Sequence, residues 1–162
     1  MRFSAIFAFA CIAAMTSPAF AAEKRLKKAD VPAVVLAAVA AKYPKATLTE
    51  FAQEDEAGKT VYEVQLKVGK AKTELSVSAD GKILTEEKTI ARKELPAAVG
   101  KSLSTSLYAK AKLIKIEMVT DSAKPDAPTY EILVTHQGKA HELVFTATGQ
   151  LTKDETESED AD

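Results

Sequence analysis

Two histidines come nearest, by residue type and spacing, to a reactive or metal-binding site in this chain. His136 and His141 flank Gln137-Gly138, a dipeptide typical of a two-residue hairpin turn. Such a turn places both rings on one face of adjacent strands, in diagonal positions, where they can hold a metal ion. The pair comes without a nearby third ligand. The pattern therefore favours partly buried structural histidines over a zinc site, and we expect no cofactor.

The sequence carries none of the usual catalytic constellations. Its single cysteine is Cys11, and it contains no G-x-S-x-G nucleophile motif. It also lacks the glycine-rich motifs G-x-x-x-x-G-K-[ST] and G-x-G-x-x-G, which cradle phosphates. We assign the acidic side chains to turns, to solvated strand faces and to the C-terminal segment. No catalytic residue and no enzyme activity are therefore expected.

Acidic clusters are the remaining candidates for ion binding. Glu54-Asp55-Glu56 and the acids near the C-terminus can attract calcium loosely. Neither segment has the D-x-[DN]-x-[DN]-G loop that builds a coordinating cage. A solvated loop and a solubilising tail are the favoured interpretations.

The first residues predict a bacterial secretory signal peptide. Arg2 supplies a positive charge, and an uncharged apolar stretch follows from Phe3 to Met15. The small-x-small pattern Ala19-Phe20-Ala21 predicts cleavage after Ala21, and so a periplasmic or secreted protein. A retained anchor is the weaker alternative, because a membrane-spanning helix needs roughly 20 apolar residues. Cys11 lies inside this segment without a lipobox, so the exported chain has no cysteine.

The charge balance argues against nucleic acid as a partner. The chain has 22 Lys and Arg residues against 23 Asp and Glu residues, a net charge of −1 at pH 7. Excluding the acids of segment 153–162 leaves a mildly basic chain, without the concentrated positive stripe of a nucleic-acid binder. These tail acids are Asp154, Glu155, Glu157, Glu159, Asp160 and Asp162. We expect segment 153–162 to be an acidic disordered tail.

The chain contains an internal repeat. Val31-Pro32-Ala33 returns as Leu95-Pro96-Ala97, and Tyr62-Glu63-Val64 returns as Tyr130-Glu131-Ile132. Further matches in the same order pair Tyr43 with Tyr108, Gly69-Lys70-Ala71 with Gly138-Lys139-Ala140, and Gly81 with Gly149. The signal peptide at 1–21 is therefore followed by a first repeat over 22–90 and a second repeat over 91–152.

Each repeat is predicted to form one helix and four meandering strands. Asp30 as N-cap and Pro32 in the first turn favour a helix that ends at Pro44. Alternation with period two predicts half-buried antiparallel strands, as at Tyr62, Val64, Leu66 and Val68. We therefore expect an α+β fold, in which two helix-plus-four-strand repeats form one antiparallel sheet of about eight strands with both helices on one face.

The outward face of this predicted sheet differs between the repeats. It is polar in the first repeat, whereas the second repeat carries Leu133 and Val144 there. Leu113 and Val119 can lie nearby on the first strand of the second repeat. An apolar patch on a solvent face usually marks a contact site, so these residues are the candidate partner-binding set. The alternatives are that the tail, a bulge or a dimer partner covers the patch.

The motifs of the first repeat resemble those of PepSY-like, or beta-lactamase-inhibitor-like, proteins. They are Val31-Pro32, Val35, Tyr43-Pro44, Ala46, Tyr62-Glu63-Val64 and Ala79-Asp80-Gly81-Lys82-Ile83-Leu84. The second repeat departs from the pattern, with Ala109 in place of Pro44 and Thr148 in place of Asp80. The resemblance implies an exported, non-catalytic module, since related PepSY domains are thought to restrain secreted peptidases. The beta-lactamase target does not carry over, because those inhibitors have disulfides and an aromatic concave sheet.

Two classes of function follow. The first is an exported non-catalytic binding module that restrains a secreted or periplasmic enzyme by protein–protein contact, through the outer face of the sheet. The alternative is a cell-envelope protein that binds a small ligand or a metal ion, between the repeats or at the histidine pair. The identity of the partner and the oligomeric state are left open by the sequence.

Overall fold

The computed structural model describes residues 24–56 and 58–156. The predicted signal peptide lies outside these residues. The first half of the described chain comprises β1 (Lys24–Arg25), a 3₁₀ turn (Lys28–Asp30), α1 (Ala33–Lys42), β2 (Thr47–Glu56), β3 (Lys59–Val68), β4 (Ala71–Ser78) and β5 (Ile83–Thr89).

The second half repeats the order of a 3₁₀ turn, a helix and four strands, as the internal repeat predicts. Both helices begin directly after a proline, Pro32 or Pro96, whose missing N–H is not needed at a helix start. Asp30, the predicted N-cap, lies instead in the preceding 3₁₀ turn. The elements are a 3₁₀ turn (Arg92–Glu94), α2 (Ala97–Thr105), β6 (Lys112–Asp121), β7 (Thr129–His136), β8 (Lys139–Thr146) and β9 (Leu151–Thr156).

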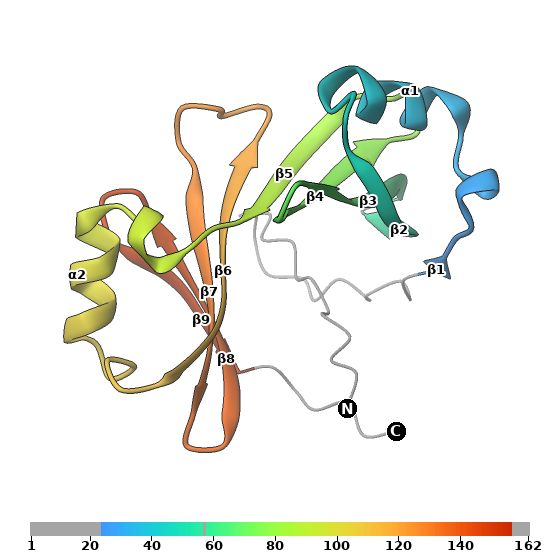
Figure 1. Cartoon of the computed structure of the whole chain (residues 1–162). Helices are drawn as coiled ribbons and strands as arrows, with labels where there is room; N and C mark the ends of the chain where they lie inside the picture. Colours follow the sequence, from blue (N-terminus) through green and yellow to red (C-terminus); the bar gives the residue numbers. More distant parts are fainter. Residues whose placement is uncertain (1–23, 57, 157–162) are drawn as a thin grey trace.

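The strands form a single antiparallel sheet of 9 strands, in which neighbours in the sequence are neighbours in the sheet (Figure 1). The prediction of about eight strands missed β1, because a strand of so few residues shows no alternation. Lys24 and Arg25 of β1 pair with Gln53 and Ala52 of β2. At the other end, β9 continues to Thr156 and so extends into the segment predicted as a tail.

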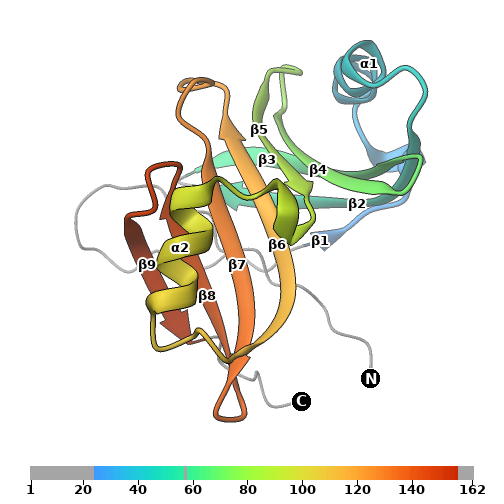
Figure 2. The same cartoon turned by 60° about the vertical axis from the view of Figure 1, so that its left-hand side comes forward.

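Each helix packs against its own half of the sheet, α1 against β2–β5 and α2 against β6–β9 (Figures 1 and 2). Each contact forms a separate hydrophobic cluster. The first combines Val35 and Val39 of α1 with Val64, Leu66, Leu75 and Val77. The second combines Val99 and Leu103 of α2 with Ile116, Tyr130, Ile132, Val134, Leu143 and Phe145. Within the described chain, neither helix has the length and apolar character needed to cross a membrane.

An equivalent tyrosine anchors the end of the helix to the last strand in each repeat. Tyr43, directly after α1, donates a hydrogen bond of 2.6 Å to Glu86 of β5. Tyr108, in the loop after α2, lies 2.8 and 2.9 Å from the two carboxylate oxygens of Asp154 on β9. Burial and the Asp154 carboxylate raise the pKa of Tyr108 to about 12, so the phenol stays protonated and donates. The duplication thus preserved a polar contact as well as a hydrophobic one.

Two hairpin turns approach the helices closely and require glycine. Gly81 lies between β4 and β5 with φ +85°, and Gly149 lies between β8 and β9 with φ +84°. A Cβ atom at Gly81 would lie 2.7 Å from the side chain of Val34, and one at Gly149 would lie 2.6 Å from the carbonyl oxygen of Ala98. The matched glycines therefore let equivalent turns pack against α1 and α2.

The strand register distinguishes the two faces of the sheet. Apolar residues of the clusters pair with one another across strands, such as Val64 with Leu75 and Ile132 with Leu143. The alternate residues form the other face, which we call the glutamate face. Its central members are Glu63, Glu74, Ser76, Thr85, Glu87, Glu117, Val119, Glu131, Leu133, Glu142 and Val144.

Candidate functional site

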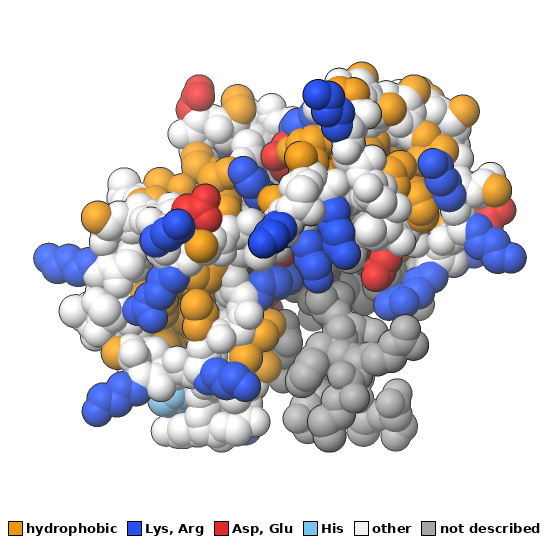
Figure 3. Space-filling model, viewed as in Figure 1, with side chains coloured by type: hydrophobic (Ala, Val, Ile, Leu, Met, Phe, Trp, Pro, Cys, Tyr) orange, Lys and Arg blue, Asp and Glu red, His pale blue; other side chains and the backbone are white. Residues whose placement is uncertain are grey.

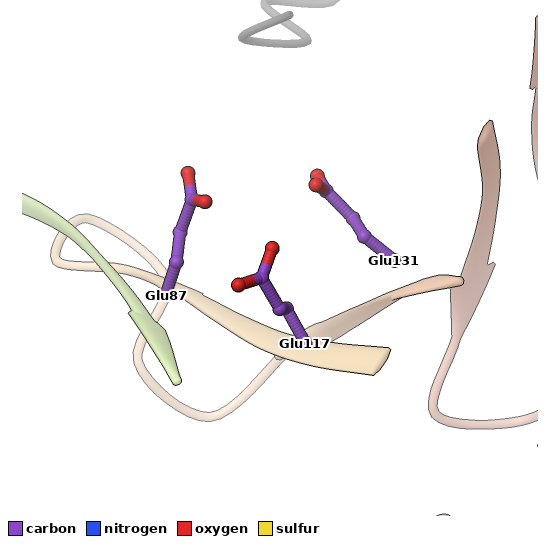
Figure 4. Close-up of side chains that lie close together, drawn as sticks. All are labelled: Glu87, Glu117 and Glu131. Atoms are coloured by element: carbon purple, nitrogen blue, oxygen red, sulfur yellow. The ribbon is translucent and has the colours of Figure 1, made fainter. Parts of the chain in front are cut away.

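A cluster of carboxylates lies on the glutamate face, where the two repeats meet (Figure 4). Glu87 of β5, Glu117 of β6 and Glu131 of β7 each offer a carboxylate oxygen, and these oxygens lie within 4.8 Å of one another. Glu117 pairs directly with Glu131. Glu87 lies diagonal to Glu117, because Glu117 pairs with Thr89, the next residue of β5 on this face. Three adjacent strands therefore bring these carboxylates together.

The cluster is largely buried. The exposed fraction is 7% for Glu87 and 7% for Glu117, and Glu131 is half-buried. Among the described residues, Oε2 of Glu87 and Oγ1 of the neighbouring Thr85 are buried without a hydrogen-bond partner. An unpartnered buried carboxylate oxygen destabilises the fold unless a proton, a cation or a donor group meets it.

Acidic side chains outnumber basic ones around the cluster. Nζ of Lys115 lies 2.7 Å from Oε2 of Glu117, so this lysine offsets one member of the cluster. Nζ of Lys153 lies 3.0 Å from Glu142, the acid next to Glu131. On the other side, Glu74 pairs with Glu87 in the strand register. The nearby lysines therefore do not neutralise all the carboxyl groups that face one another.

Burial and mutual repulsion raise the pKa values of two of these carboxyl groups. Burial raises the pKa of Glu87 to about 9, and the charges of Glu131 and Glu74 contribute. The pKa of Glu131 is raised to about 8, mainly by burial and secondly by the neighbouring carboxyl group of Glu142. Both groups therefore hold protons at neutral pH when nothing else occupies the cluster. A bound cation would displace these protons.

The two histidines lie on the other face of the sheet, beside Tyr108. They occupy diagonal positions, since His141 pairs with Val134, the neighbour of His136 on that face. Their ring centroids are 6.2 Å apart, and both side chains are half-buried. Nδ1 of His141 lies 3.1 Å from Oη of Tyr108. Within the described chain, the metal-compatible group of acidic and imidazole ligands is the glutamate cluster, which includes neither histidine.

The predicted partner-binding residues do not share one environment. Leu133 and Val119 lie half-buried on the glutamate face, whereas Val144 lies on this face but is only 5% exposed. Leu113 packs against the second hydrophobic cluster on the other face. A bulge between Leu113 and Lys115 reverses the alternation within β6. The prediction of Leu113 as an outward-facing residue is therefore wrong.

A cavity of about 440 Å³ lies at the β1–β4 end of the glutamate face. Its lining includes Glu63 and Glu74 of the sheet, together with Arg25, Lys27 and Lys28 of the N-terminal segment. This end of the face therefore combines acidic and basic groups. Figure 3 shows Lys and Arg side chains spread over both halves of the molecule rather than gathered along one element.

Reasoning from the sequence missed the glutamate cluster, because an acidic residue at an outward strand position normally faces water. Glu87, Glu117 and Glu131 were all assigned to solvated positions on this basis. The available signal was the recurrence of an outward-facing glutamate on three successive strands. Recognising it requires the register between β5 and β6, which pairs residues of different repeats.

A protein-family model matches the chain twice, over residues 21–85 and 62–153. The family is described as "Putative beta-lactamase-inhibitor-like, PepSY-like". The chain belongs to this family. The match of one model at two places fits the internal repeat, and it confirms the resemblance to PepSY-like proteins that the sequence motifs indicated.

Two solved structures with a similar fold are of Bacteroides proteins. One from Bacteroides eggerthii, described as "putative periplasmic proteins", has a TM-score of 0.69 and 18% identity, covering 78% of this chain and 88% of that chain. A BLIP-like protein from Bacteroides fragilis has a TM-score of 0.63 and 20% identity, covering 81% of this chain and 91% of that chain. At these identities the likeness shows the fold alone. No curated protein matches the chain.

Proposed function

We propose that this PepSY-like protein is an exported, non-catalytic binding module that restrains a secreted or periplasmic enzyme by protein–protein contact. One observation carries the proposal: the strand register creates a continuous face that neither hydrophobic cluster uses. We infer that both helices cover the opposite face, so that the glutamate face is the surface offered to a partner.

The contact region is centred on Leu133 of β7. Leu133 is half-buried and pairs with Lys115 of β6 and Glu142 of β8. Val119, also half-buried on this face, lies further along β6. An apolar centre with charged neighbours is the usual composition of a protein interface. Val144 is buried, so it supports this region rather than contacting a partner.

The family and the N-terminal sequence support the same proposal. The family description refers to a likeness to beta-lactamase inhibitors, which act by binding an enzyme. The segment Phe3 to Met15, followed by Ala19-Phe20-Ala21, has the pattern of a signal peptide. A protein exported in this way shares its compartment with periplasmic and secreted enzymes.

Affinity capture with a matched pair of variants tests the proposal. The immobilised protein is exposed to periplasmic extract of its host, and a retained enzyme is assayed with and without added protein. Leu133→Gln copies Gln65, the residue at the matching position of the first repeat, and should abolish retention. Val68→Gln alters an apolar side chain that is 42% exposed at the end of β3, and should retain the enzyme. Retention that is unaffected by Leu133→Gln, or a captured enzyme that keeps full activity, contradicts the proposal.

A second candidate function is the binding of a small ligand or a metal ion in the cell envelope. The observation that favours it is the glutamate cluster with the unpartnered oxygen of Glu87. This candidate does not involve the histidine pair on the other face of the sheet.

A further inference from the structure

We propose that Glu87, Glu117 and Glu131 bind one divalent cation of the calcium class at the junction of the two repeats. The site borders the contact region, since Glu87 pairs with Val119 and Glu131 precedes Leu133 on the same face of β7. This inference does not rest on the proposed enzyme partner. It assigns a ligand to buried acidic groups that have no role in the packing of either hydrophobic cluster.

The spacing of the carboxylate oxygens accommodates a calcium ion. Calcium binds oxygen ligands at about 2.3–2.6 Å, so ligands on opposite sides of the ion lie about 4.6–5.2 Å apart. The carboxylate oxygens of Glu87, Glu117 and Glu131 lie within 4.8 Å of one another. Magnesium requires a tighter octahedron at about 2.0–2.1 Å and keeps most of its water, which fits a set of sheet-borne carboxylates less well.

The ligand atoms also favour a hard cation. All three groups offer carboxylate oxygen, and the cluster contains neither sulfur nor imidazole. Zinc and copper prefer ligand sets that include nitrogen or sulfur, whereas calcium takes oxygen ligands alone. Each glutamate stands on a different strand of a paired sheet, so the backbone already positions the ligands. Figure 4 shows the carboxylates directed toward a common space.

The burial of Glu87 is the second, separate observation that points to a ligand. Only 7% of this residue is exposed, and its Oε2 atom finds no hydrogen-bond partner among the described residues. Lys115 forms an ion pair with Glu117, and its charge offsets only part of the effect that burial and the neighbouring carboxylates have on Glu87. A cation would satisfy the unpartnered oxygen and remove the repulsion between neighbouring carboxylates at the same time.

Protons are the competing occupants of the cluster. Raised pKa values keep Glu87 and Glu131 protonated at neutral pH in the absence of a cation. Calcium must therefore displace protons, which makes its binding stronger at higher pH. A cluster built only to share protons would not respond to calcium at all. The two possibilities therefore differ in a measurable way.

Calorimetric titration of the full-length protein, freed of metal with EDTA, provides the test. We expect CaCl₂ to bind with one ion per chain at pH 7.5–8, with MgCl₂ binding at least tenfold more weakly, a ratio that corresponds to about 1.4 kcal/mol. If calcium binding releases protons, the measured heat of binding should change when the titration is repeated in buffers of different ionisation enthalpy. Calcium should also raise the melting temperature.

Matched variants locate the ion. Glu87→Gln and Glu117→Gln should each weaken calcium binding at least tenfold and abolish the shift in melting temperature. Glu50→Gln makes the same change at an exposed position of β2 and should leave binding unchanged. Glu131→Asp keeps the carboxyl group and shortens the side chain, so it should weaken calcium binding even if a variant without the carboxyl group fails to fold.

Two results would overturn the inference. The first is a wild-type protein that gives no heat of binding when calcium is added and whose melting temperature calcium does not change. The second is calcium binding that persists unchanged in Glu87→Gln and Glu131→Asp, which would place the ion elsewhere. Neither result affects the proposed contact at Leu133, because the capture experiment is performed on a different set of variants.

Discussion

Glu117 on β6 stands directly opposite Glu131 on β7. Like charges at directly opposed positions destabilise an antiparallel pair, so this arrangement is unusual unless another group compensates it. The pairing of β5 with β6 then adds Glu87, which belongs to the first repeat. Neither repeat contains the complete cluster by itself. The site is therefore a property of the junction between the repeats.

The pH dependence of stability should report this cluster. The pKa of Glu87 is raised from 4.5 to about 9 in the folded protein. Between these values the folded state holds a proton that the unfolded state has released, so the free energy of unfolding falls as pH rises. In calcium-free buffer we expect the melting temperature to decrease between about pH 5 and about pH 9 through this group.

The control for this prediction is the difference between variants, measured by differential scanning calorimetry. Glu87→Gln should flatten the decrease relative to the wild type, and Glu50→Gln should not. The charged groups that face Glu87 are Glu74, Glu117, Glu131 and Lys115, and both variants retain all four of them. A slope that is the same in Glu87→Gln and wild type would show that Glu87 does not titrate in this range.

The turn between β8 and β9 should be the more sensitive of two glycine positions. Gly149→Ala places a methyl group 2.6 Å from the carbonyl oxygen of Ala98, at a φ of +84°. Gly138→Ala meets a similar φ of +81° but open space. We expect Gly138→Ala to lower the free energy of unfolding by about 1–2 kcal/mol, and Gly149→Ala to lower it more. If urea unfolding showed the same loss in the free energy of unfolding for both variants, the close packing of this turn against α2 would be contradicted.

Tyr130 should contribute more to stability than its repeat counterpart Tyr62. Tyr130 belongs to the second hydrophobic cluster and is 7% exposed, whereas Tyr62 is half-buried at the border of the first cluster. Tyr130→Ala should lower the free energy of unfolding by about 3–5 kcal/mol, as large-to-small substitutions in a core do. Tyr62→Ala should cost less. Chemical denaturation of both variants checks the order, and a larger loss at Tyr62 would reverse it.

The hydrogen bond of Tyr108 and the packing of its ring should make separate contributions to stability. Tyr108→Phe keeps the ring but removes the hydroxyl that donates to Asp154. Hydrogen bonds to a charged group contribute about 1.5–3 kcal/mol, so we expect a loss of that order in urea unfolding. Asp154→Asn leaves an acceptor in place and should cost less. A neutral effect of Tyr108→Phe would mean that the ring alone anchors the loop.

Export should remove the N-terminal segment. The intact mass of protein purified from the periplasm should correspond to a chain that begins at Ala22, because signal peptidase accepts the pattern Ala19-Phe20-Ala21. A mass that includes the segment up to Ala21, or a lipid on Cys11, would contradict the predicted compartment.

Much of the architecture follows from local patterns in the sequence. The repeated Val-Pro or Leu-Pro pair starts each helix, and the matched glycines at 81 and 149 form equivalent turns. Alternation with period two identified the buried side of β3, where Val64 and Leu66 join a hydrophobic cluster. Local sequence suffices for these features because helix starts, tight turns and strand pleats depend on neighbouring residues.

The outward positions of the second repeat were predicted less well, and Leu113 shows why. Counting alternate residues along β6 assumes an unbroken strand, but the bulge before Lys115 shifts the count by one residue. Ile114 occupies the bulge, and Leu113 turns into the hydrophobic cluster on the other face. A bulge is stabilised by pairing with a neighbouring strand, so the alternation of β6 alone does not reveal it.

The sequence by itself determined the family, the duplicated plan of a helix and four strands, and the meander of antiparallel hairpins. The tertiary structure alone decided that Glu87, Glu117 and Glu131 meet and become buried. The physical reason is the range of the interactions involved. Alternation and turn chemistry act within a few residues, whereas the environment of a carboxyl group depends on which strands pair beside it, and here those strands come from different repeats.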